Sequence, residues 1–190
     1  MNKGDTVVML IDKLNTLFGI IKLKLFILFY LKNVKVGKHN RIKKDFHIII
    51  DKKSKLIIGN NFRCKYGFKA SCLYGGILEI GNNVFINNNC DITAIKRIKI
   101  GNNVLIGHNF FAIDHDHDYK NNIKNFVSND IEIGNNVWIG ANVTILKGVH
   151  IGDNCVIAAN TLVSKNIQSN CIIKEKKEYA ITMIGEKNEL

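Results

Sequence analysis

The segment DHDHDY, which begins at Asp114, places two histidines among alternating aspartates. A neutral imidazole such as that of His115 or His117 can accept a proton near neutral pH. A carboxylate from Asp114, Asp116 or Asp118 could hold the second imidazole nitrogen and fix the tautomer. Histidine and aspartate are also metal ligands. The residues alone therefore leave three interpretations: a general base, a metal site, or a solvated polar arm that performs no chemistry.

These histidines lie in the longest interruption of a six-residue repeat. Neither a strand nor a helix keeps one apolar position at a spacing of six, whereas a coil with three short faces does. Hexapeptide periodicity is a known signature of the parallel β-helix. The sequence therefore predicts an all-β solenoid whose inward positions in the last coils are Ile133, Ile139, Ile145, Ile151, Ile157 and Val163.

The motif GNN, with the variant GDN at Gly152, marks successive coils, and its spacing locates the interruption. Gly134 and Gly152 are 18 residues apart, which is three hexapeptides and one coil, whereas Gly101 and Gly134 are 33 residues apart. One coil therefore contains about 15 additional residues, the loop 114–130. Loops of that length within compact domains are usually functional. Glycine and asparagine suit the tight corners, where stacked asparagines can bond from coil to coil.

Length and composition indicate one solenoid domain, since the chain has 190 residues and a hydrophobic content of 46%. We predict an N-terminal helical cap at 1–33, a β-helix domain at 34–175 and a C-terminal strand or tail at 176–190. The cap region is apolar, with interspersed lysines, and is expected to form one or two helices over the open end of the solenoid. The alternative is peripheral membrane contact through a helix whose lysines face anionic lipid.

The chain has a formal net charge of +11, but its lysines are dispersed and accompany no nucleic-acid motif. We therefore expect no nucleic-acid partner, and a basic surface that suits anionic small molecules. The five cysteines include no CxxC pair. They are expected to be reduced in a cytoplasmic protein, which is associated with the inner face of the membrane if the helix contacts lipid.

The stretch GNNVWIGANVTILKGVHIGDNCVIAANTLVSK, residues 134–165, resembles the hexapeptide-repeat acyltransferases, in particular the galactoside, maltose and surface-polysaccharide O-acetyltransferases. The resemblance extends from about Gly59 to Lys165. It implies a left-handed parallel β-helix with one long protruding loop. It also implies a homotrimer that binds acetyl-CoA in a groove between neighbouring solenoids, so that each active site lies between subunits.

The resemblance implies His117 as the catalytic residue, because the family's histidine falls there when GNNVLIG (101–107) is matched without gaps. Asp118 and Tyr119 also match the HDY of some polysaccharide acetyltransferases. His115 is the principal rival. The imidazole would take the proton of a sugar hydroxyl as it attacks the thioester, while a backbone N–H stabilises the oxyanion.

Other positions transfer from the family one at a time. Asn87 matches an acceptor-binding asparagine, although it is also explained as a stacked corner residue. Trp138 is expected to point outward, toward the groove or a neighbouring chain. Acetyl-CoA contacts are implied for small residues along the pantetheine channel and for a Ser-Lys pair near the nucleotide: Gly107, Ala141, Ala159, Ser164 and Lys165. Corner packing and solvation are the alternatives for these five.

The chain departs from the family in two places. The loop is about three residues shorter than in the galactoside branch, so its acceptor contacts cannot be transferred. After Lys165 the sequence lacks the prolines that family members commonly have, so the family's CoA contacts in that region are not transferred to this chain.

These observations predict an O-acetyltransferase that moves the acetyl group of acetyl-CoA to a hydroxyl of a sugar or bacterial surface polysaccharide, without a metal. One alternative is an N-acyltransferase acting on a nucleotide-linked amino sugar. Another is a non-catalytic solenoid that serves in assembly. A third is metal catalysis of the γ-class carbonic anhydrase kind, for which the required histidine spacing is not evident.

Overall fold

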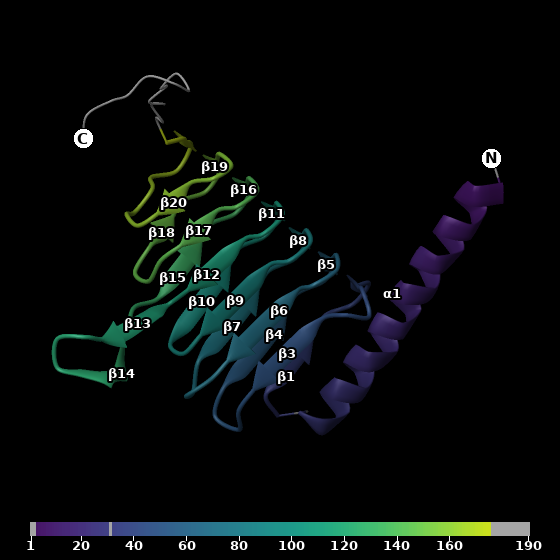
Figure 1. The fold of residues 1–190 in the computed structure, drawn as a ribbon, viewed down its shortest axis with the longest axis horizontal. Coiled ribbons are helices and arrows are strands. Elements are labelled where there is room, and N and C mark those ends of the chain that lie inside the picture. The colour runs from purple at the N-terminus through teal and green to yellow at the C-terminus, as the bar shows by residue number, and fades with distance from the viewer. Residues whose placement is uncertain (1–2, 31, 176–190) are drawn as a thin grey trace, which may run out of the picture.

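The computed structural model describes residues 3–30 and 32–175. Within these residues the chain winds into a parallel β-solenoid that carries a single helix, α1 (Lys3–Phe29), at its N-terminal end (Figure 1). The predicted solenoid is confirmed, and one helix forms where one or two were expected. The predicted tail at 176–190 lies outside the described residues.

Each coil contributes one short strand, of two to four residues in most cases, to each of three parallel sheets. The first sheet contains β1 (Val34–Val36), β4 (Lys55–Ile58), β7 (Ile77–Ile80), β10 (Arg97–Ile100), β15 (Ile131–Ile133) and β18 (His150–Ile151). The second contains β2 (Arg41–Ile42), β5 (Arg63–Cys64), β8 (Phe85–Ile86), β11 (Leu105–Ile106), β16 (Trp138–Ile139), β19 (Val156–Ile157) and β21 (Ile172–Ile173). The third contains β3 (His47–Ile50), β6 (Lys69–Cys72), β9 (Asp91–Ala94), β12 (Phe111–Ile113), β17 (Thr144–Ile145) and β20 (Leu162–Val163).

The register of the sheets follows the hexapeptide repeat. Ile106 pairs with Ile139, which pairs with Ile157, and all three are buried. Stacking identical side chains along the axis removes each from water on both sides, and burial of one such side chain contributes about 1.5–3 kcal/mol. The predicted inward series from Ile133 to Val163 is buried throughout and forms part of one continuous core.

Three corners join the sheets. We call the turn from the first to the second sheet the first corner, that from the second to the third sheet the second corner, and that from the third sheet back to the first the third corner. Asparagines with positive φ recur at the first corner, as at Asn103 (58°) and Asn136 (55°), and at the second, as at Asn109 (56°). Their side chains also stack as predicted, since Nδ2 of Asn103 donates to Oδ1 of Asn136 at 3.0 Å.

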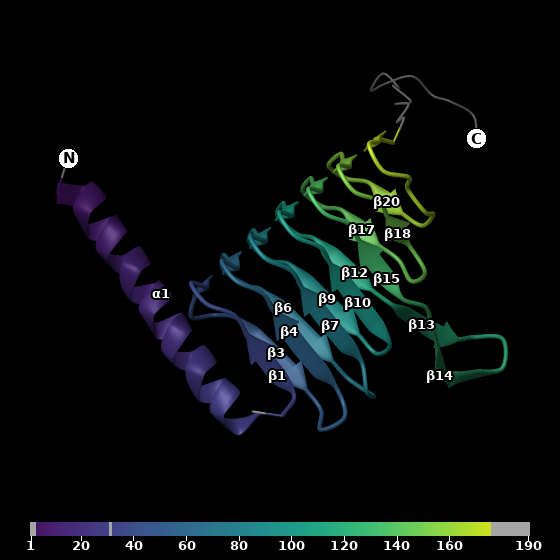
Figure 2. The same ribbon diagram turned by 180° about the vertical axis from the view of Figure 1, so that it is seen from behind.

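Helix α1 packs against the first coil along a narrow contact (Figure 2). A Cβ atom at Gly19 would lie 1.9 Å from the carbonyl oxygen of Ile42, so glycine is required for this close approach. Leu23 is buried there, and Nζ of Lys22 donates to the carbonyl oxygen of Phe46 at 2.6 Å. The helix therefore covers the end of the solenoid core at its N-terminal side.

Candidate functional site

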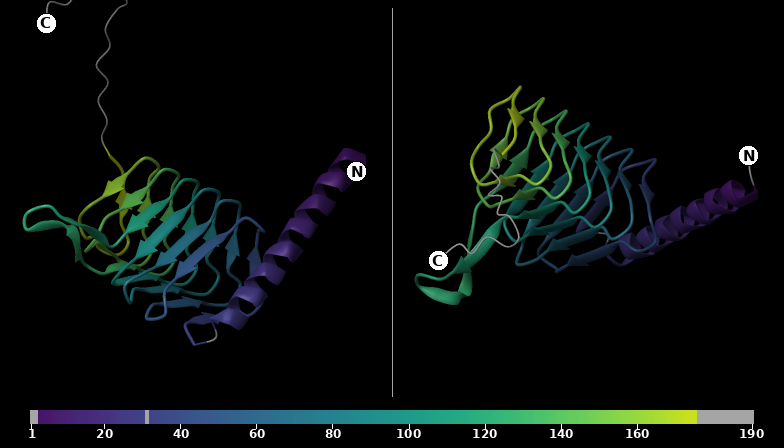
Figure 3. Two further views of the ribbon diagram at one scale, coloured as in Figure 1. Left: turned by 60° about the horizontal axis from the view of Figure 1, so that its bottom comes forward. Right: turned by 45° about the horizontal axis from the view of Figure 1, so that its top comes forward.

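The predicted loop 114–130 is an antiparallel hairpin rather than an irregular loop. Strand β13 (His115–Asp118) pairs with β14 (Asn122–Ser128), with His115 opposite Ser128 and His117 opposite Phe126. We call this hairpin the arm. It leaves the solenoid at the third corner and projects away from it, on the side opposite α1 (Figures 1 and 3). Most arm side chains are exposed in the single chain.

The base of the arm is fixed by a buried carboxylate. The Asp114 side chain has no exposed area and accepts backbone N–H groups from Ile95 at 2.9 Å and from Lys96 at 2.8 Å. Nδ1 of His115 lies 3.0 Å from Oδ1 of Asp114. Because an ionised carboxylate can only accept, Nδ1 carries the proton and Nε2 of His115 keeps a lone pair. Asp114 therefore holds both the preceding coil and one imidazole.

His117 lies further along the arm and is exposed. Its Nδ1 is 2.6 Å from the carbonyl oxygen of Ile123, which can only accept, so Nε2 is again the free nitrogen. Of the three aspartates that could hold an imidazole nitrogen, Asp114 therefore holds that of His115, whereas a backbone carbonyl takes this place at His117. Asp116 pairs instead with Lys147 of the next coil. Asp118 accepts from the Asn121 side chain, which lowers the pKa of that carboxyl.

An aromatic cluster that sequence reasoning missed surrounds the two imidazoles. The Phe126 ring lies 5.0 Å from that of His115, edge to face, and 4.8 Å from that of His117. Tyr74, at the third corner two coils earlier, packs on the same phenylalanine at 5.7 Å. Phe126 meets His117 only because the hairpin register pairs them. That register is not readable from the loop composition.

The second corner carries four of the other predicted residues: Asn87, Gly107, Ala141 and Ala159. Oδ1 of Asn87 accepts the N–H of Asn88 at 3.0 Å, and a Cβ at Gly107 would lie 2.7 Å from the backbone nitrogen of Ala141. Coil packing alone thus requires a small residue at position 107. The contact of these residues with acetyl-CoA or an acceptor stays a prediction.

Trp138 begins β16 on the second sheet and points outward as expected, with 58% of its surface exposed. Ser164 and Lys165 follow β20 directly and are exposed at the third corner, on the arm's side of the solenoid. Within one chain, the predicted residues therefore divide between the second and third corners, which the third sheet separates.

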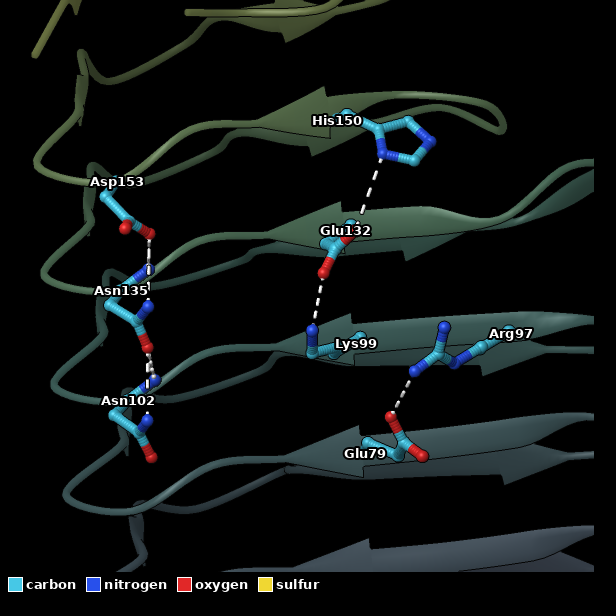
Figure 4. Close-up of polar contacts among 8 residues, drawn as sticks. All are labelled: Glu79, Arg97, Lys99, Asn102, Glu132, Asn135, His150 and Asp153. Carbon is cyan, nitrogen blue, oxygen red and sulfur yellow. Dashed lines mark hydrogen bonds and ion pairs between the residues drawn. The ribbon is translucent and has the colours of Figure 1, made fainter. Parts of the chain in front are cut away.

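A groove of about 520 Å³ runs along the first sheet near the first corner. Figure 4 shows that its charged side chains pair within the chain: Lys99 donates to Glu132 at 2.6 Å, and His150 lies 3.6 Å from the same carboxylate. The hydrogen bond from Lys99 is the main reason that the pKa of Glu132 is lowered. Neither arm histidine lines this groove. In the part of the chain that the structure describes, no group of three or more His, Cys, Asp or Glu side chains could hold a metal ion.

Comparison with known proteins agrees with this architecture. The profile of the bacterial transferase hexapeptide family (six repeats) matches residues 130–165. The inferred lipopolysaccharide-biosynthesis O-acetyltransferase WbbJ of Escherichia coli K12 is 30% identical over 127 residues, which are 60% of this chain and 65% of that protein. The matched region thus spans less than two thirds of this relative.

Two solved structures share the fold. A galactoside acetyltransferase in complex with coenzyme A is 25% identical, with a TM-score of 0.55 over 90% of this chain and 78% of that one. AntD, an N-acyltransferase from Bacillus cereus in complex with dTDP and coenzyme A, is 22% identical, with a TM-score of 0.63 over 76% and 81% of the two chains. The repeat profile, the relatives and the solenoid show that this chain is similar to the hexapeptide-repeat transferases of bacteria.

Proposed function

We propose that the protein is an O-acetyltransferase that moves the acetyl group of acetyl-CoA to a hydroxyl of a sugar or bacterial surface polysaccharide, or of its precursor. The observation that carries this proposal is the exposed imidazole of His117 on an arm of a hexapeptide solenoid, with its Nδ1–H directed to the carbonyl of Ile123. That bond leaves Nε2 as a base that an acceptor can reach. The names of WbbJ and the galactoside acetyltransferase support a carbohydrate hydroxyl as the acceptor.

In the proposed reaction, Nε2 of His117 removes the hydroxyl proton while the oxygen attacks the thioester carbonyl. The tetrahedral intermediate collapses with cleavage of the carbon–sulfur bond. The imidazolium then returns its proton to the thiolate, so that an acetyl ester and free CoA thiol leave the site. Such general-base assistance contributes about two to four orders of magnitude in rate. No step of this scheme requires a metal.

We also propose a homotrimer with its active sites between subunits. In one chain the third sheet separates the arm from the second corner, so Gly107, Ala141 and Ala159 would meet His117 only where two copies adjoin. The outward side of the second sheet carries exposed apolar residues, including Leu105 and Trp138, which a neighbouring copy would cover.

The cysteines are all free thiols, which suits a cytoplasmic enzyme.

The test is acceptor-dependent release of CoA thiol from acetyl-CoA, with a panel of sugars and glycan precursors. His117→Ala is expected to lower kcat about 10²- to 10⁴-fold without changing the oligomeric state. His47→Ala, which removes another exposed imidazole on the third sheet, is the matched control and keeps full activity. Absence of CoA binding in calorimetry would instead indicate a solenoid that serves in assembly.

His115 is the second candidate for the base, because the buried Asp114 holds its Nδ1. If His117→Ala keeps full turnover while a folded His115→Ala variant loses it, the assignment by register is wrong. The fold is shared with the N-acyltransferase AntD, so an amide product is also tested. Alkaline hydrolysis cleaves the ester expected from an O-acetyltransferase and leaves the amide that an N-acyltransferase would make.

A further inference from the structure

Helix α1 has an apolar side that the solenoid leaves uncovered. Exposed large apolar residues recur along it every three or four positions: Leu10, Leu14, Leu17, Ile21, Leu25 and Leu28. At that spacing they share one face of the helix. Lys13 and Lys24 border one edge of this face, by their positions in the helical repeat. Lys22 lies beyond the other edge and is directed to the solenoid, where it donates to the carbonyl oxygen of Phe46. We call this apolar face the outer face.

The opposite side of α1 is already occupied. Gly19 and Leu23 contact the first coil, and Nδ2 of Asn15 donates to the hydroxyl of Tyr66 at 3.0 Å. A helix that is apolar on all sides is normally buried on all sides. The outer face therefore requires a second apolar environment. The described residues contain no helix with the length and apolar character needed to cross a bilayer.

A basic groove runs beside the outer face. It has a volume of about 520 Å³, lies between α1 and the second sheet, and shares Leu17 with the outer face. Its basic lining residues are Lys13, Arg41, Lys43, Arg63 and Lys65. Five cations therefore face one carboxylate, that of Asp12. Lys43 pairs with this carboxylate and also donates to Oγ1 of Thr16 at 2.9 Å, so Asp12 has little capacity to neutralise the others.

Two of the unneutralised cations are neighbours in the sheet. Arg41 pairs in register with Arg63, which places like charges side by side on adjacent strands. Like charges directly opposite one another are destabilising. Neither guanidinium forms an ion pair with a residue that the structure describes, although that of Arg63 lies 5.5 Å from the centre of the Phe85 ring. A second hollow of about 470 Å³ continues past both arginines.

Paired guanidinium groups match the geometry of phosphate oxygens, which they bind with two parallel hydrogen bonds. From the groove and the outer face together, we infer that the protein docks on an anionic bilayer. The outer face of α1 enters the interfacial region, and Arg41 and Arg63 bind the phosphate of a phospholipid headgroup. An interfacial helix normally has a polar face opposite the face that enters the lipid. Here the solenoid covers that opposite side of α1 and provides the polar surface.

Charge complementarity favours a lipid surface over a second copy of the chain. Lysines at the edges of an apolar helical face extend toward lipid phosphates while their stems stay in the apolar region. A contact between two outer faces would bury no negative charge against these cations. Docking through α1 also leaves the arm free, because the two lie on opposite sides of the molecule (Figure 3). The inference does not depend on the proposed transferase activity.

Cosedimentation of the full chain with vesicles tests the inference. The chain is expected to bind vesicles of phosphatidylcholine mixed with phosphatidylglycerol, and to bind phosphatidylcholine alone much more weakly. The variant Arg41→Gln/Arg63→Gln should bind the anionic vesicles about 25-fold more weakly, because each basic residue near an anionic surface contributes about a factor of five. The charge-matched control Lys69→Gln/Lys174→Gln changes exposed lysines outside the groove and should bind as the unmodified protein does.

The apolar part has its own variant, Leu14→Gln/Ile21→Gln, which changes only exposed side chains and so should preserve folding. It is expected to lose vesicle binding at an unchanged thermal midpoint. The inference is overturned if either the groove variant, Arg41→Gln/Arg63→Gln, or the helix variant, Leu14→Gln/Ile21→Gln, binds vesicles as well as the unmodified protein does. It is also overturned by a helix variant that dissociates an oligomer while vesicle binding persists, which would make the outer face a contact between copies. Stabilisation by free inorganic phosphate without any vesicle binding would assign the groove to a soluble anion and also overturn it.

Discussion

Replacement of Asp114 by asparagine is the sharpest test of how the arm is held. The change keeps the size of the side chain and removes its charge. In the native chain this fully buried carboxylate accepts from the backbone N–H groups of Ile95 and Lys96 and lies 3.0 Å from Nδ1 of His115. Three donors therefore converge on two carboxylate oxygens.

Asparagine offers one carbonyl oxygen and an NH₂ group that can only donate. If the asparagine oxygen accepts from Ile95 and Lys96, its NH₂ group faces Nδ1 of His115. Either two donors then face each other without water, or the imidazole moves its proton to Nε2 and Nδ1 becomes the acceptor. A hydrogen bond to a charged group contributes about 1.5–3 kcal/mol, and a buried donor without a partner costs about 1–3 kcal/mol. Partial retention of the other bonds offsets some of this loss. We expect Asp114→Asn to lower the free energy of unfolding by about 2–4 kcal/mol.

Urea unfolding measures this change as a lower midpoint at an unchanged slope. Proton NMR provides a local readout, because the Nδ1–H of His115 should be protected from exchange in the native chain and lose that protection in the variant. Asp116→Asn, two residues further along on β13, is the matched control, since its pair with Lys147 is partly exposed and should contribute no more than about 1 kcal/mol. A midpoint for Asp114→Asn equal to that of the control would refute the reasoning.

Three further predictions concern the packing of α1 and the core. Gly19→Ala should release α1 from the first coil, because its Cβ would lie 1.9 Å from the carbonyl oxygen of Ile42; faster amide exchange in the helix would show this, and unchanged exchange would contradict it. Cys171 should be the first thiol to react with a disulfide reagent in the native protein, because burial raises the pKa of three others: to about 12 for Cys64 and Cys72, and to about 11 for Cys90. The hydrogen bond from Lys43 lowers the pKa of Asp12, so the pair stabilises the docked helix above the ordinary pKa of 3.8 and that stabilisation disappears as the pH falls through the lowered value. The free energies of unfolding of the native chain and of Asp12→Asn, measured as the pH is lowered, should therefore differ only above that range. Identical free energies at neutral pH would show that the pair contributes nothing.

The solenoid and its register could be predicted from the sequence because the information is local and repeated. An inward position that recurs every six residues specifies the same environment in each coil, so Ile133, Ile139 and Ile145 are buried as expected. The additional residues between Gly101 and Gly134, which are 33 residues apart instead of 18, likewise located the arm without showing that it is a hairpin. The outward direction of Trp138 followed from the same alternation.

The environments of the two arm histidines were decided only by the tertiary structure. The composition of DHDHDY offers three carboxylates to either imidazole, and adjacent sequence positions do not show which one turns inward. Asp114 is committed to His115 because the preceding coil supplies two backbone N–H groups at that point, while the hairpin brings Ile123 to His117.

The basic groove is likewise a product of folding. Arg41 and Arg63 are 22 residues apart, and Lys13 belongs to a different element. Only the stacking of β2 on β5 and the angle of α1 bring these charges together. A repeat fixes the face on which a side chain lies, because that depends on neighbours in the chain, whereas the contacts between side chains of different coils depend on how the coils and the helix are placed in space.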